Sequence, residues 1–93
     1  MIKTKILWVD DEVDLLKPHI IFLENKDFLI QTCNNGSDAV EIIRNENFDA
    51  VLLDENMPGL NGIETLTLMR DISSNIPIIM ITKSEEENIM DDA

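Results

Sequence analysis

Residues 50–62 read AVLLDENMPGLNG, and this stretch decides the fold. Its apolar run ends at Asp54, and a loop dense in turn formers follows. A short strand that is apolar at every position is typical of a parallel sheet covered by helices on both faces. From Ile63 to about Ile72, Leu66 and Met69 recur at helical spacing on one side. The stretch therefore predicts a strand, a loop and a helix in succession.

The same unit recurs on both sides of this stretch. Residues 6–9 form an apolar run that stops at an acidic triplet, and an amphipathic helix is expected from Val13 to about Asn25, with Pro18 near its first turn. Residues 28–33 predict the second strand, and Ser37 is the expected cap of the next helix. Residues 76–81 predict the fourth strand, and Ser84 begins a further helix. The second helix is expected to carry an apolar side of Ala39, Val40, Ile43 and Phe48.

Short apolar strands that alternate with helices predict an α/β fold with a doubly wound parallel sheet. The 93 residues are enough for one small domain, and they contain no repeat and no interdomain linker. We therefore expect one domain over residues 1–93, which stops within its fourth helix.

Charge is the unusual bulk property of the chain. Seven basic and 19 acidic residues give a net charge of −12, which disfavours nucleic acid and anionic membranes as direct partners. Cys33 is the single cysteine and His19 the single histidine, so neither a disulfide nor a Cys/His metal site is expected. With no secretory leader and no apolar run long enough to cross a bilayer, we expect a cytoplasmic protein.

Polar side chains follow the predicted strands where each strand ends. Asp10 and Asp11 follow the first strand, Asp54 ends the third and Thr82 ends the fourth. In an open parallel sheet, ligands bind outside the carboxyl ends of the strands, so these side chains are expected at one edge. Several carboxylates there suit a hard cation such as Mg²⁺ (or Mn²⁺), and a carboxylate beside such an ion can attack phosphorus.

Each of these residues also has an ordinary structural interpretation. Asp10 and Asp11 are good residues for the start of a helix, and Asp54 is a good turn former ahead of a Pro-Gly pair. Thr82 is an ordinary β-branched residue for a strand end. The coincidence of these residues at three strand ends favours the functional interpretation.

Three segments resemble the signature segments of the receiver domain of response regulators, which has the CheY-like variant of the flavodoxin-like fold. They are residues 7–12 (LWVDDE), 52–62 (LLDENMPGLNG) and 77–82 (PIIMIT). The resemblance runs in register from Ile6 to about Ser84. The particular residues of these segments, together with ITKSEEE at residues 81–87, look closest to those of the PorX group of regulators.

The resemblance implies a part in two-component signal transduction. Asp54 would accept a phosphoryl group from a sensor histidine kinase, and Asp10, Asp11, Asp54 and the backbone carbonyl of Asn56 would hold Mg²⁺. Thr82 would be the switch hydroxyl that contacts the phosphoryl group. A downstream output domain or protein, which the sequence does not name, would read the change. Such a domain is not an enzyme, although it assists its own phosphorylation and dephosphorylation.

Two departures from the family pattern stand out. The residue after the switch hydroxyl is usually small, whereas here it is Lys83, which either points to solvent or controls phosphoryl access and contact. The family's fifth strand, with its lysine, and the last helices are not among these residues. The fourth strand would then be an edge, and a dimer through residues 78–81 is expected.

Two other functions remain open at this point. One is an interaction module that works without phosphorylation, which the missing lysine favours. The other is a small Mg²⁺-dependent phosphohydrolase with an aspartyl nucleophile. Such enzymes usually place a second acid two residues after the nucleophile, where this chain has Asn56.

Overall fold

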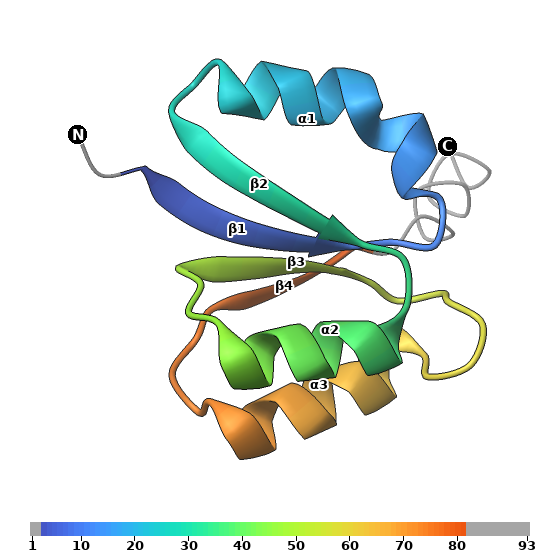
Figure 1. Ribbon diagram of the computed structural model, residues 1–93. Coiled ribbons are helices and arrows are strands. Elements are labelled where there is room, and N and C mark those ends of the chain that lie inside the picture. The colour runs from blue at the N-terminus through green and yellow to red at the C-terminus, as the bar shows by residue number, and fades with distance from the viewer. Residues whose placement is uncertain (1–2, 82–93) are drawn as a thin grey trace, which may run out of the picture.

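The computed structural model describes residues 3–81, in which four parallel strands form a single sheet. The strands are β1 (Thr4–Val9), β2 (Phe28–Cys33), β3 (Ala50–Asp54) and β4 (Ile78–Ile81), and the helices are η1 (Val13–Leu16), α1 (Lys17–Glu24), α2 (Gly36–Asn45) and α3 (Gly62–Ile72). The sheet order β2-β1-β3-β4 reproduces the first four positions of the flavodoxin-like order. Figure 1 shows α1 over one face of the sheet, with α2 and α3 side by side over the other. The predicted doubly wound α/β fold is confirmed.

The main core lies between the sheet and the pair α2–α3. Side chains alternate between the two faces of a strand, so Leu7 and Val9 of β1 point to this core together with Val51 and Leu53 of β3. All four are fully buried, as is Met69 of α3. The side chains between these positions point to the opposite face of the sheet, which α1 covers. Asp10 and Asp54, at the carboxyl ends of β1 and β3, continue this second set.

The helix predicted from Val13 to Asn25 is divided in two. A 3₁₀ turn, η1, comes first, and the α-helix begins only at Lys17, with Pro18 in its first turn. Proline has no N–H to donate to the carbonyl four residues earlier, so an α-helix cannot run through Pro18 without losing a bond, whereas the first turn tolerates it. No residue of η1 or α1 is buried.

The start of α2 corrects one expected cap. Asn35, rather than Ser37, precedes the helix, and its side-chain oxygen accepts a hydrogen bond of 2.8 Å from the backbone N–H of Asp38. Ala39, Val40 and Ile43 are buried as expected. Phe48 lies beyond the end of α2 and packs against the core from the following segment, so its assignment to the helix was wrong.

The fourth strand begins at Ile78, two residues later than expected. Pro77 has no N–H for a sheet bond, but its carbonyl accepts from the backbone N–H of Val51 at 2.9 Å. The helix expected from Ser84 lies outside the described residues. Across residues 3–81, no helix has the length and apolar character that a membrane span requires.

Candidate metal centre

Three carboxylates meet at the carboxyl edge of the sheet. One oxygen from each of Asp10, Asp11 and Asp54 lies within 4.8 Å of the others. Asp10 and Asp54 are 1% exposed, whereas Asp11 is exposed to solvent. The structure thus brings together the acids that follow two separate strands.

The sheet itself fixes the two buried acids. Val9 and Leu53 are partners in the β1–β3 register, so the next residue of each strand, Asp10 and Asp54, arrives at the same level. The backbone N–H of Asp10 donates to the carbonyl of Cys33 at 2.9 Å, which continues the ladder with β2. Beyond Asp54, the N–H of Glu55 donates to the carbonyl of Ile81 at 3.0 Å. A hydrogen bond to an outer strand, β2 at Asp10 and β4 next to Asp54, therefore helps to set the position of each acid.

Each buried carboxylate also shapes the turn that follows it. Asp10 Oδ1 accepts from the backbone N–H of Glu12 at 2.8 Å, and Asp54 Oδ1 accepts from that of Asn56 at 3.2 Å. These are the local turn bonds that aspartate forms with the residue two positions later. An aspartate can form such a turn while exposed to solvent, so turn formation does not explain why Asp10 and Asp54 are buried next to a third carboxylate. Burial of a charged group is costly unless it is compensated.

The donor set fits a hard divalent cation. Carboxylate oxygens are the ligands of Mg²⁺, which keeps several waters and needs few protein ligands, and Asp11 leaves the cluster open to solvent on one side. The nearby Cys33 is not part of this group: its thiol is buried in the core, where burial raises its pKa, and it donates a hydrogen bond to the carbonyl of Asn35. Among residues 3–81, the three acids are the one group of His, Cys, Asp and Glu side chains close enough to share a metal ion.

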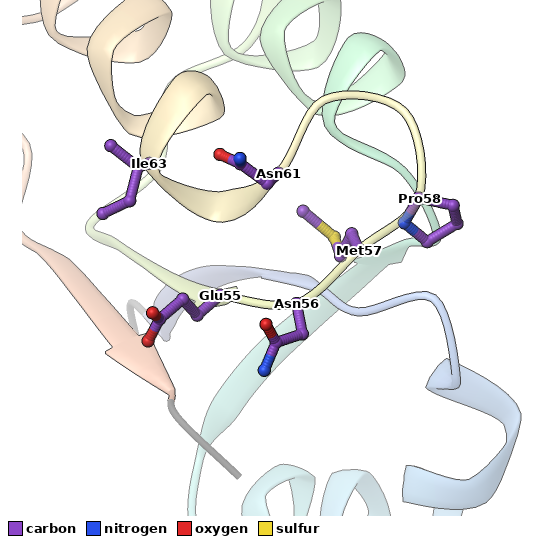
Figure 2. A pocket seen from close by; sticks show the side chains of 6 residues that line it. All are labelled: Glu55, Asn56, Met57, Pro58, Asn61 and Ile63. Carbon is purple, nitrogen blue, oxygen red and sulfur yellow. The ribbon is translucent and has the colours of Figure 1, made fainter. Parts of the chain in front are cut away.

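A depression of about 390 Å³ is lined by residues of the β3–α3 loop and the start of α3, and it begins at the residue after Asp54. Figure 2 shows its lining, with Glu55 and Asn56 on one side and the start of α3 on the other. The exposed Asn56 links the two features, because it lines the depression and its N–H bonds to Asp54. Met57, next along the loop, is buried and joins the core cluster.

One structural residue of the site was missed from the sequence. Gly62 begins α3, and a Cβ there would lie 2.6 Å from both the carbonyl oxygen of Asp54 and the Cα of Glu55. Only glycine allows α3 to approach the site so closely. The signal in the sequence is a glycine at the first position of a helix, but a glycine there is equally typical of the turn before it.

The family model for the response regulator receiver domain matches residues 6–93. The chain belongs to this family. The receiver is thus homologous to the regulators of two-component systems, as the resemblance of its three segments indicated. The narrower assignment to the PorX group stays a prediction.

Known relatives and structures agree with this assignment. The receiver is 43% identical over 84 residues to the transcriptional regulatory protein CpxR homolog of Haemophilus influenzae, a match that covers 90% of this chain and 36% of that protein. It therefore spans about a third of the length of that curated relative. The crystal structure of the response regulator TrrA of Thermotoga maritima, in complex with Mg²⁺ and BeF, matches with 33% identity and a TM-score of 0.79, over 85% of this chain and 69% of that one.

A second similar structure holds a regulator and its kinase together. TrrA in complex with the histidine kinase ThkA matches with 32% identity and a TM-score of 0.79, over 86% of this chain and 69% of that one. The two other predicted site residues, Thr82 and Lys83, lie outside the residues that the structure describes.

Proposed function

We propose that Asp54 is the phosphoacceptor of this receiver. An oxygen of its carboxylate attacks the phosphorus of a phosphohistidine, the P–N bond breaks, and the imidazole leaves with a proton from solvent. The observation that carries this role is the burial of Asp54 within 4.8 Å of two further carboxylates, at the edge where α/β sheets bind ligands.

Asp10, Asp11, Asp54 and the backbone carbonyl of Asn56 would hold Mg²⁺, and Mn²⁺ is the expected substitute. When bound, the ion neutralises charge on the transferring phosphoryl group. The residues of this chain then orient the reaction: the N–H of Asn56 fixes Oδ1 of Asp54 at 3.2 Å, and the bond from the N–H of Glu55 to the carbonyl of Ile81 holds the backbone next to it. We also propose that Thr82 contacts the phosphoryl group as the switch hydroxyl, and that Lys83 controls its access.

The proposed donor is a sensor histidine kinase, and the complex of TrrA with ThkA supports this choice. The domain would not be an enzyme with a separate substrate, since the group that reacts is its own side chain. Its setting would be cytoplasmic, with no direct contact to nucleic acid or membrane, in keeping with a net charge of −12. An output domain or protein would read the phosphorylated surface.

A protein made of residues 1–93 alone would dimerise through β4. In the described part of the chain, β4 pairs with β3 on one side only, and Ile79 is 54% exposed. Such an edge presents unpaired backbone groups to a second copy. Analytical ultracentrifugation is expected to show a dimer that Ile79→Lys disrupts, and a monomer at all concentrations would contradict this.

Adduct formation and ester turnover together separate the three functional alternatives. The proposed receiver binds fluoroberyllate in the presence of Mg²⁺, and Asp54→Asn does not, as ¹⁹F NMR would show. An interaction module that works without phosphorylation gives no adduct in either protein. A phosphohydrolase instead turns over a generic ester such as para-nitrophenyl phosphate repeatedly. Either of the last two results would replace the proposed function.

A further inference from the structure

The first turn of α3 lies between two close glycine contacts. On one side, Gly62 approaches the backbone of Asp54 and Glu55, and its N–H donates to the carbonyl of Glu55 at 3.0 Å. On the other side is Gly36, the first residue of α2. A Cβ on Gly36 would overlap the hydroxyl oxygen of Thr65. The start of α3 is therefore held between the end of β3 and the start of α2, the helix beside it in Figure 1.

The turn that receives these contacts is a tightly bonded unit. Asn61 caps α3, and its side chain accepts from the N–H of Glu64 at 2.9 Å while Glu64 accepts from the N–H of Asn61 at 3.0 Å. Thr65 is fully buried, and its hydroxyl donates to the carbonyl of Asn61 at 2.8 Å. A displacement of Thr65 therefore also displaces Asn61, because the hydrogen bond between them holds the two residues together.

The loop before this turn is closed and has little freedom to adjust. The bond from the N–H of Gly62 to the carbonyl of Glu55 joins its two ends. Inside the loop, Met57 is anchored in the core, and Leu60 lies so near Gly36 that a Cβ added to the glycine would be 3.0 Å from the Leu60 Cβ. Asn56, which bonds to Asp54, sits between these fixed points. Displacement of α3 by α2 must therefore move the segment that carries Asn56.

We propose that Gly36 is a positioning residue for the metal centre. By having no side chain, it lets α2 close on Thr65 and Leu60, and this contact sets where the β3–α3 loop holds the carbonyl of Asn56. This role rests on the proposed Mg²⁺ site. It places a determinant of metal affinity on α2, which contributes no ligand to the ion.

The test is the Mg²⁺ dissociation constant of the full chain, measured by isothermal titration calorimetry. For Gly36→Ala we expect binding about tenfold weaker, the lower end of what changes outside the ligand shell cost. Thr65→Ala removes the opposing hydroxyl and is expected to bind normally on its own. The double variant is expected to recover part of the affinity that Gly36→Ala loses, because two residues in contact couple, while the close approach of the added Cβ to Leu60 remains. Equal binding by Gly36→Ala and the parent would overturn the role.

A control distinguishes positioning from loss of stability. Ile43→Val lies near the other end of α2, in the core, and removes a methyl group at a cost of about 0.5–1.5 kcal/mol. It is expected to lower the free energy of unfolding and leave Mg²⁺ affinity unchanged. If Gly36→Ala behaves in the same way as Ile43→Val, Gly36 is merely a packing residue.

Two further outcomes bear on the role of Gly36. If Gly36→Ala does not fold, Thr65→Val tests the same contact with a smaller steric change. It replaces the hydroxyl that faces Gly36 with a methyl group. Weaker Mg²⁺ binding by this variant supports the role, and parental binding overturns it. A parent protein that binds no Mg²⁺ overturns the metal centre itself, a result distinct from equal binding by parent and variant.

Discussion

Asp54→Asn is expected to stabilise the Mg²⁺-free protein. The change keeps an oxygen to accept the hydrogen bond from Asn56 but removes one of three negative charges whose oxygens lie within 4.8 Å of one another. At that separation two unit charges repel by about 3.5 kcal/mol in an effective dielectric of about 20, and by about 0.9 kcal/mol in bulk water. Asp11 is exposed and screened, so the buried pair of Asp10 and Asp54 dominates, and we expect a gain of about 1–3 kcal/mol.

The free energy of unfolding should be measured by urea titration, at low salt and with a chelator present. Trp8, the single tryptophan, provides the fluorescence signal. Adding Mg²⁺ is expected to stabilise the parent, by about 2.7 kcal/mol at a hundredfold excess over its dissociation constant, and to stabilise the variant much less. High salt should reduce the difference between parent and variant without Mg²⁺.

A matched change elsewhere separates the cluster from the substitution itself. Asp71→Asn makes the same chemical change at an exposed position of α3, outside the cluster, and is expected to stay within about 0.5 kcal/mol of the parent. If Asp54→Asn is less stable than the parent without Mg²⁺, repulsion among the three acids does not govern the stability of this site, and the expectation is refuted.

Two further changes test the packing and the charges around this site and at the opposite end of the sheet. Gly62→Ala is expected to cost about 1–3 kcal/mol in urea titration, because its Cβ would meet the backbone of β3, and a parental free energy of unfolding would refute that contact. Hydrogen bonds from Lys5 and then Gln31 hold the pKa of Glu46 below its ordinary value of 4.5. Because a depressed pKa means that the folded state favours the carboxylate, the parent should exceed Glu46→Gln in stability at neutral pH, and the advantage should vanish as the pH falls below 4.5. A difference between these two proteins that does not change with pH would contradict the assignment.

The strands were predictable because each apolar run is bounded by residues that end it. The run at 28–33 stops at Asn34-Asn35-Gly36, and β2 has those bounds. The capping residue of α2 was not predictable, because Asn35 and Ser37 are both good capping residues and the apolar spacing does not choose between them. The break before Lys17 follows from Pro18, but the apolar spacing on both sides of it concealed the division.

The meeting of Asp10, Asp11 and Asp54 was predictable because parallel strands end at one edge of a sheet. The burial of Asp10 and Asp54 was not predictable, since the sequence does not show which acids the neighbouring turns cover. The contact of Gly36 with Thr65 also lay beyond the sequence. It joins two helices that are adjacent only because α2 and α3 cover the same face of the sheet.

The most direct test of Asp54 as phosphoacceptor is mass spectrometry after incubation with acetyl phosphate and Mg²⁺. We predict one added phosphoryl group, on the peptide that contains Asp54, and its absence from Asp54→Asn and from samples with a chelator. A phosphoryl group on another residue, or equal labelling of Asp54→Asn, would contradict this role.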